Sequence, residues 1–207
     1  MAISKNIIKY LDENKIKYEI LEHRTVYTAL DKAATLRVLP RIVGKTLTVK
    51  FDPTSLKLRG AGKNYALVLI AADKLLDKAK LKKVIKNLLK KQDQKSIKTI
   101  DFVNEAWMKK NFKGIQIGAV PPFGAIWEFP TFIDKVLLKE KKIIVNSGDY
   151  NSSLKILCSD LKKTSGSVFD NFSEKKPVTK SKKKPAKKII QKKSKSKRAN
   201  KKKSKRK

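Results

Sequence analysis

Hydrophobic positions in the first third of the chain alternate between helical and strand-like spacing. Ile3, Ile7 and Leu11 fall on one side of a helix, with polar residues between them. The pattern predicts helices over residues 3–15 and 28–38, and strands over residues 18–23, 42–51 and 65–72. The last strand is continuously apolar, which is typical of a strand buried on both faces.

The second half mixes the two spacings without regular alternation. An amphipathic helix capped by Asp73 is predicted from Leu75 to about residue 91. Further along, the pattern predicts strands over residues 96–102, 132–140, 141–148 and 154–161, and a short helix over residues 105–112. Because the order is not a strict strand–helix repeat, we expect a mixed α/β fold with a curved, barrel-like mixed sheet flanked by helices.

The periodicity stops near residue 163, so residues 1–163 are expected to form one domain. Residues 164–174 are interpreted as a linker, and residues 175–207 as a disordered lysine-rich tail. The tail holds 19 lysines and arginines and no acidic residue, so it cannot bury enough apolar surface to offset its ordering entropy.

Charge points to a polyanionic partner. The chain has 52 basic and 18 acidic residues, a net charge of +34, and residues 1–174 alone have 33 basic against 18 acidic. Neutralising phosphates releases counterions, which favours nucleic acid as the partner; solubility or a general lysine bias of the proteome is the alternative. The predicted nucleic-acid contacts of the tail are Lys182, Lys183, Lys184, Lys187, Lys188, Lys192, Lys193, Lys201, Lys202 and Lys203.

Common catalytic and metal-binding sets are missing from the sequence. The single histidine, His23, and the single cysteine, Cys158, cannot form a Cys/His zinc site, and both are expected to be structural. No P-loop spacing surrounds the GKT at residues 44–46. We therefore expect no cofactor and no metal. No apolar run is long enough to span a membrane and the N-terminus does not resemble a signal peptide, so we expect a cytoplasmic protein.

Lys45 is unusual because it follows Gly44 within an apolar strand. Strand alternation places Lys45 on the same face as Leu47, Val49 and Phe51. A bulge at Gly44 would instead turn Lys45 outward, and the local pattern does not separate the two alternatives. An inward lysine would need an anionic partner or a polar cavity.

A second unusual stretch is GAVPPFG, Gly118 to Gly124. Proline restricts φ and lacks an N–H, whereas glycine allows close approach of the backbone. The stretch could be a rigid loop whose amides face a ligand. On local evidence alone, a tight turn between strands is favoured.

Taken in order, the segments are HRTVYTALDKAA, VGKTLTV, YALVLIAADKLLDKAKLKK, GIQIGAVPPFG and VNSG. Over residues 1–163 the chain resembles the YbaK/prolyl-tRNA synthetase-associated editing domain family, the trans-editing aminoacyl-tRNA deacylases. The most specific matches are Lys45 in VGKTLTV and the G-x-x-x-P loop, met by Gly118 and Pro122.

The resemblance implies hydrolysis of a mischarged aminoacyl-tRNA, chiefly Ala- or Cys-tRNA-Pro. It implies that Lys45 binds the 3′-terminal adenosine and the substrate, and that the backbone of the Gly118 loop lines the pocket that receives the ester. Positioning and backbone N–H groups would replace a side-chain nucleophile. The implied substrate-binding residues are Ala119, Val120, Pro121, Pro122, Phe123, Gly124, Asn146, Ser147 and Gly148. Many relatives carry a small polar residue in place of Pro121, which leaves the identity of the amino acid open.

The implied partner is an aminoacylated tRNA, with a prolyl-tRNA synthetase or a translation factor as a further partner. We expect a monomer with no membrane contact, whose basic tail adds affinity for tRNA. Two alternatives are kept: a non-catalytic RNA- or DNA-binding protein on the same fold, and a DNA-compacting protein that depends on the tail.

Overall fold

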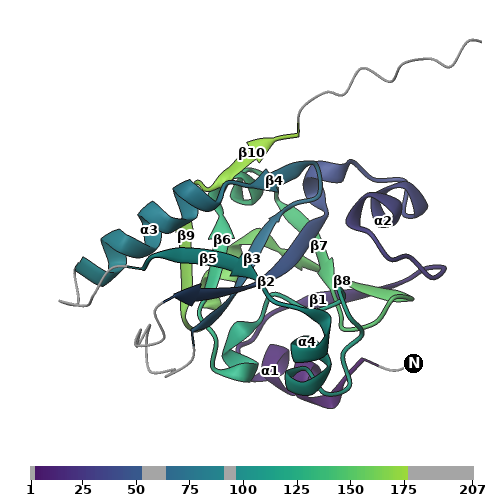
Figure 1. Ribbon diagram of the computed structural model, residues 1–207. Coiled ribbons are helices and arrows are strands. Elements are labelled where there is room, and N and C mark those ends of the chain that lie inside the picture. The colour runs from purple at the N-terminus through teal and green to yellow at the C-terminus, as the bar shows by residue number, and fades with distance from the viewer. Residues whose placement is uncertain (1–2, 53–63, 91–96, 177–207) are drawn as a thin grey trace, which may run out of the picture. The chain divides into compact units, whose positions relative to one another are not determined.

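A five-stranded mixed sheet forms the centre of the computed structural model, which describes residues 3–52, 64–90 and 97–176 (Figure 1). Its strand order is β5 (Thr99–Phe102), β2 (Gly44–Asp52), β3 (Tyr65–Ala71), β6 (Thr131–Asp134) and β9 (Ser167–Asp170). β2 runs antiparallel to β3 and β5, whereas β6 runs parallel to β3 and β9. The predicted mixed α/β fold is confirmed.

A second, antiparallel sheet lies beside the start of β2. Its order is β1 (Tyr18–Glu22), β8 (Ser152–Leu157) and β7 (Lys142–Asn146). The two sheets meet at an isolated bridge between Val43 and Ile144, both buried. A short pair, β4 (Lys74–Leu76) with β10 (Ser173–Lys175), completes the strands of the described residues.

The prediction of a barrel-like sheet is wrong. The five-stranded sheet has β5 at one edge and β9 at the other, and these two strands do not pair. A barrel requires its first and last strands to close the hydrogen-bond ladder. In the described part of the chain, only the Val43–Ile144 bridge joins the hydrogen-bond ladders of the two sheets.

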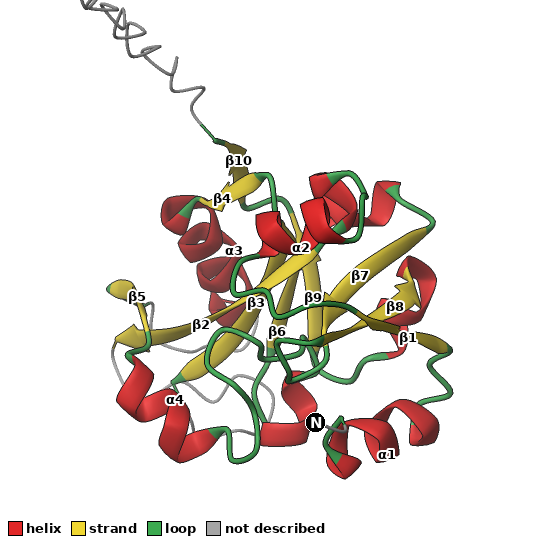
Figure 2. Ribbon diagram, turned by 90° about the vertical axis from the view of Figure 1, so that its right-hand side faces the viewer, coloured by secondary structure: helices red, strands yellow, loops and turns green. Residues whose placement is uncertain are grey.

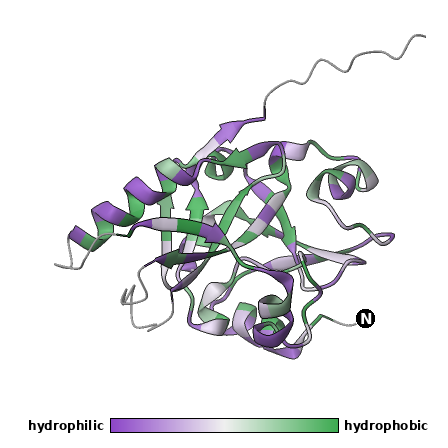
Figure 3. Cartoon of the chain, viewed as in Figure 1, coloured by the Kyte–Doolittle hydropathy of each residue, from purple (hydrophilic) through white to green (hydrophobic). Residues whose placement is uncertain are grey.

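Helices cover the sheets on several sides (Figure 2). α2 (Ala29–Thr35) lies on the opposite side of the strands from α1 (Lys5–Glu13) and α4 (Glu105–Asn111), while α3 (Lys78–Lys90) covers one face of the five-stranded sheet. Figure 3 shows α3 hydrophobic on one side and hydrophilic on the other, as its sequence period predicts. Four 3₁₀ helices occur in the described residues: η1 (Pro40–Ile42), η2 (Gly124–Trp127), η3 (Lys135–Lys139) and η4 (Cys158–Lys163).

Alternation along β3 explains its continuous apolar run. Ala66, Val68 and Ile70 join the core under α3. Leu67 and Leu69 point to the other face and enter two further apolar clusters. The prediction of a strand buried on both faces is confirmed.

Several predicted element bounds are wrong. Asp73 does not cap the amphipathic helix, because β4 intervenes and the Asp77 carboxylate accepts the first-turn N–H of Lys80 at 3.0 Å. The strand predicted over residues 132–140 ends at Asp134, where η3 begins. The strand predicted over residues 154–161 likewise ends at Leu157.

Residues 164–174 are not a linker. They contain β9, an edge strand of the five-stranded sheet, and the start of β10. Phe172 is fully buried in the core under α3. The few apolar residues of this segment are separated by serines and acidic residues, so the sequence pattern does not predict a strand. The segment forms a strand because it pairs with β6, which is distant in the sequence.

No helix in the described part of the chain is both long and apolar enough to cross a membrane. The tail lysines predicted to contact nucleic acid, Lys182 to Lys203, lie outside the described residues.

Candidate active site

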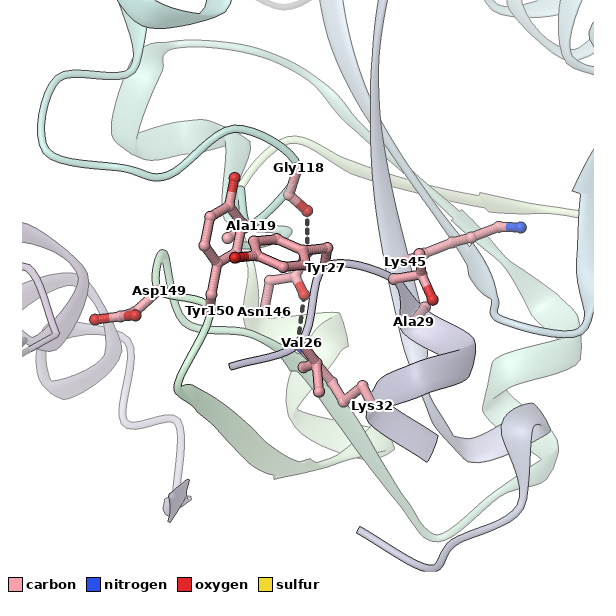
Figure 4. A pocket seen from close by; sticks show the side chains of 11 residues that line it. Val26, Tyr27, Ala29, Lys32, Lys45, Gly118, Ala119, Asn146, Asp149 and Tyr150 are labelled. Atoms are coloured by element: carbon pink, nitrogen blue, oxygen red, sulfur yellow. Dashed lines mark hydrogen bonds between the residues drawn. The ribbon is translucent and has the colours of Figure 1, made fainter. Parts of the chain in front are cut away.

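A small cavity opens between α2, the start of β2, the Gly118 loop and the turn after β7 (Figure 4). Its volume is about 40 Å³. It is lined by Val26, Tyr27, Thr28, Ala29, Lys32, Lys45, Gly118, Ala119, Asn146, Asp149 and Tyr150. Segments distant in the sequence thus meet here, and four of the residues predicted from sequence are among them: Lys45, Gly118, Ala119 and Asn146.

Lys32 is carried into the cavity by α2. Thr28 caps this helix, its Oγ1 accepting the Asp31 N–H at 3.1 Å. Lys32 then falls on the same side as Ala29 and Ala33, which is the buried side of the helix. Its side chain is only 5% exposed, and desolvation lowers its pKa to about 8.

Asn146, the last residue of β7, joins Lys32 to the loop. Lys32 Nζ donates to Asn146 Oδ1 at 2.7 Å. Asn146 Nδ2 donates to the carbonyl oxygens of Gly118 at 3.1 Å and Val120 at 3.3 Å. In Figure 4 these contacts form a continuous line from α2 to the loop.

The turn after β7 holds the same loop from a second side. Gly148 N–H donates to the Ala119 carbonyl at 3.0 Å, and its carbonyl accepts Gln116 N–H at 2.9 Å. Gly148 has φ of +100°, and a Cβ there would lie 2.8 Å from Ile115 Cδ1, so glycine is required. Ser147 is fully buried and donates to the Ser152 carbonyl at 2.9 Å, so it supports the turn and does not line the cavity.

Tyr27 and Tyr150 line the cavity. Tyr150 OH donates to the Ile117 carbonyl at 2.6 Å, which ties this ring to the loop. Tyr27 packs edge-on against Tyr150, with ring centroids 4.9 Å apart, and is 71% exposed. The pKa of Tyr150 is raised, chiefly by burial and further by Tyr27 and Glu105.

Asn146, Gly148 and Thr131 form hydrogen bonds with the Gly118–Gly124 loop, and only its first two residues line the cavity. Gly118 is exposed with φ of +81°, and its N–H has no acceptor among the described residues. Ala119 to Gly124 are buried, Val120 and Phe123 within apolar clusters. The loop leads into η2 and not into a strand, so the prediction of a tight turn between strands is wrong.

The second half of the loop supports the cavity from behind. Gly124 N–H donates to Thr131 Oγ1 at 3.0 Å, and a Cβ at Gly124 would lie 2.4 Å from the Phe129 carbonyl oxygen. Pro121 and Pro122 are buried and do not line the cavity. Substitution at Pro121 would therefore reach the cavity only through the loop backbone.

Lys45 lies on the inward face of β2. The β2–β3 register is continuous from Gly44 to Lys50, so a bulge at Gly44 is absent. Lys45 Nζ donates to the Lys74 carbonyl at 2.6 Å, and Figure 4 shows it directed away from Asn146. Burial is the main cause of its lowered pKa; Lys176 lowers it further and Asp73 opposes the shift.

His23 and Cys158 have structural contacts, as predicted. His23 Nδ1 donates to the Arg24 carbonyl at 2.9 Å, and its Nε2 lies 2.8 Å from Ser153 Oγ. Cys158 is buried and donates to the Leu137 carbonyl, and burial raises its pKa to about 11. Within the described residues, no group of three or more His, Cys, Asp or Glu side chains could hold a metal ion.

Seven cavity residues were not predicted from the sequence: Val26, Tyr27, Thr28, Ala29, Lys32, Asp149 and Tyr150. A signal existed only for Lys32, because Ala29, Ala33 and Leu36 mark the apolar side of its helix and Lys32 falls within that side. Tyr150 and Asp149 follow a strand end in a polar turn, and nothing local distinguishes them from surface residues.

A protein-family model covers the segments that form the cavity. The family model described as the aminoacyl-tRNA editing domain matches residues 23–164, a span that holds all the cavity residues. A search of curated proteins finds no match.

Solved structures share the fold. A crystal structure of a protein described as hypothetical has a TM-score of 0.66 and 20% identity, covering 82% of this chain and 100% of that chain. A crystal structure of a proposed trans-editing enzyme for prolyl tRNA synthetase has a TM-score of 0.61 and 17% identity, covering 84% and 99%. Since the family model spans most of the described fold, the chain belongs to the aminoacyl-tRNA editing domain family.

Proposed function

We propose that the chain hydrolyses the ester bond between an amino acid and a mischarged tRNA, acting in trans. The observation that carries this proposal is the cavity, in which a rigid glycine loop from the family region is clamped by Asn146 and the turn after β7. Family membership supports the reaction class.

Backbone groups would supply the chemistry. Water adds to the ester carbonyl carbon, the bond to the ribose oxygen breaks, and the products are a free amino acid and a tRNA with a free 3′-terminal hydroxyl. The Gly118 N–H is a fixed donor without a described acceptor, so it can stabilise the oxyanion that develops on the carbonyl oxygen. The ester is already activated, and orientation beside such a donor lowers the barrier further.

Lys45 and the two tyrosines would hold the end of the tRNA. Lys45 can exchange its carbonyl contact at Lys74 for a phosphate or ribose oxygen, which would relieve its desolvation. Tyr27 is exposed at the cavity and offers a ring face on which the terminal adenine can stack, as aromatic rings do for single-stranded nucleic acids.

The identity of the amino acid follows from the family resemblance. We propose Ala- or Cys-tRNA-Pro as the substrate, in the cytoplasm where tRNA is charged. The choice of tRNA-Pro as the carrier is supported by the similarity to the proposed trans-editing enzyme for prolyl tRNA synthetase.

The alternative is a nucleic-acid-binding protein without catalysis, which the net charge of +34 favours. Single-turnover deacylation of Ala-, Cys-, Ser- and Pro-charged tRNA-Pro separates the two functions. We expect rapid loss of one mischarged species with Pro-tRNA-Pro spared, and loss of activity in Lys45→Ala with bulk RNA binding retained. Salt-sensitive binding of all four species without hydrolysis would support the binding protein and contradict the enzyme.

A further inference from the structure

Lys32 is a buried ammonium at the centre of the candidate site. Its side chain is almost fully removed from solvent, and its Nζ contacts Asn146 Oδ1 at 2.7 Å. Asn146 is itself 7% exposed. Neither the family model nor the sequence pattern assigns a role to Lys32.

The contact decides which way the Asn146 amide faces. Lysine can only donate and backbone carbonyls can only accept. Oδ1 must therefore face Lys32, and Nδ2 must face the carbonyls of Gly118 and Val120. Without the Lys32 donor, Oδ1 would be a buried acceptor with no partner, which weakens the hold of the amide on both carbonyls.

Burial of Lys32 has a cost that the packing of α2 does not require. An ammonium removed from water destabilises the fold unless its hydrogen bonds compensate. Its neighbours Ala29 and Ala33 belong to the apolar cluster beside α2, so an apolar side chain would suit this side of the helix. The hydrogen bond of its ammonium leads instead to Asn146 and through it to the loop, which indicates a role in holding the loop.

We propose that Lys32 is a positioning residue for deacylation: it holds the Asn146 amide, which in turn holds the Gly118 and Val120 carbonyls and aims the loop at the substrate. This inference rests on the proposed function. Lys45 cannot substitute, because its ammonium contacts the Lys74 carbonyl and is directed away from Asn146. The two lysines of the cavity thus have separate tasks.

Other titratable groups line the same cavity and must be considered in any test of Lys32. They are Tyr27 ahead of α2, Lys45 in β2, and Asp149 and Tyr150 in the turn after β7. The lowered pKa of Lys32 is caused by desolvation, so its ammonium is held mainly by the Asn146 contact.

Lys32→Met tests the proposal, since methionine keeps much of the length and removes the donor. We expect kcat to fall about 10- to 100-fold, as displacement of a positioned group does, with KM for tRNA changed less than about twofold. The melting temperature should stay equal or rise, because a buried charge is removed. Lys32→Arg, which keeps a cation, should retain more activity than Lys32→Met. Lys9→Met, an exposed lysine of α1, is the control and should leave kcat unchanged.

The double variant Lys32→Met/Asn146→Ala tests whether Lys32 acts through Asn146. We expect it to be no slower than Asn146→Ala alone, because both changes release the same loop. Fully additive losses would overturn the proposal. So would an unchanged kcat in Lys32→Met, or a rise in KM alone, which would place Lys32 against the tRNA.

A structural readout separates this inference from the proposed function. In a nitrogen-15 correlation spectrum of the wild type, the Gly118 and Ala119 amide signals should be sharp, and in Lys32→Met they should shift or broaden. Sharp, unshifted signals in the variant would overturn the positioning role. A wild type that deacylates no charged tRNA would overturn deacylation itself, while the spectrum would still decide whether Lys32 orders the loop.

Discussion

The Lys32 ammonium lies 2.7 Å from Asn146 Oδ1, joining residues 114 positions apart in the sequence. Through this contact, α2 controls a loop that belongs to neither of the sheets. Two sets of contacts therefore fix the loop beside the cavity: the hydrogen bonds from Lys32 through Asn146, and those of Gly148 in the turn after β7. Each set can be tested separately.

The stability of the fold should depend on pH through Lys32. Its folded-state pKa is about 8 against 10.5 when solvated, so the unfolded chain keeps this proton over a range where the native chain has lost it. The free energy of unfolding should rise with pH between about 8 and 10.5, by at most about 1.4 kcal/mol per pH unit from this group. Below pH 8 the Lys32 contribution is a constant penalty.

Denaturant unfolding of the wild type and Lys32→Met at pH 7, 8, 9 and 9.5 measures this term. Other groups titrate equally in both proteins, so the stability difference isolates Lys32. The wild type should gain on the variant as pH rises above 8. A difference that does not vary with pH would show that Lys32 titrates normally.

Gly118→Ala should reduce activity more than stability. Gly118 has φ of +81°, and a Cβ added there would meet no atom within 4 Å, so alanine is resisted by backbone strain and not by a clash. We expect a cost of about 1–2 kcal/mol and at least about a tenfold loss of kcat, since the N–H proposed to face the oxyanion is displaced.

Gly114→Ala is the matched control for this change. Gly114 has φ of +77° and equally open surroundings, but it does not line the cavity. Its stability cost should be similar and its kcat unchanged. Equal kinetic effects of the two variants would argue against a catalytic role for the Gly118 backbone.

Tyr27→Ala should weaken tRNA binding and spare the fold. The ring is 71% exposed, so its removal should change the free energy of unfolding by less than about 0.5 kcal/mol. If the terminal adenine stacks on it, KM should rise about 5- to 100-fold, and Tyr27→Phe should restore most of the loss. Leu39→Ala, another exposed apolar position, should have no effect on KM.

Truncation after Lys176 should raise KM and reduce the dependence of KM on salt, with single-turnover kcat unchanged. Each lost phosphate contact removes a released counterion. The truncation is placed after Lys176 so that β10, which ends at Lys175 and pairs with β4, is kept. A truncated chain with the wild-type salt dependence would show that the folded part supplies the affinity.

Local patterns predicted most of the helices and strands. The spacing of apolar residues located α1, α2 and β3 to within a few residues. Predictions failed where pairing partners were distant: β9 and β10 looked like a linker, and closure of the sheet could not be judged from strand count. Pairing across the chain decides these features, and sequence period carries no information about it.

The candidate site was predicted in part. Lys45, Gly118, Ala119 and Asn146 came from a family resemblance and do line the cavity, whereas Lys32 was missed although it falls on the apolar side of its helix. What the amino-acid order determined alone is most of the helices and strands and the basic charge, because these depend on neighbouring residues. Only the tertiary structure decided which lysine meets Asn146 and which turns away, because that depends on how α2, β2 and β7 pack, and a buried ammonium is tolerated only where packing brings it a partner.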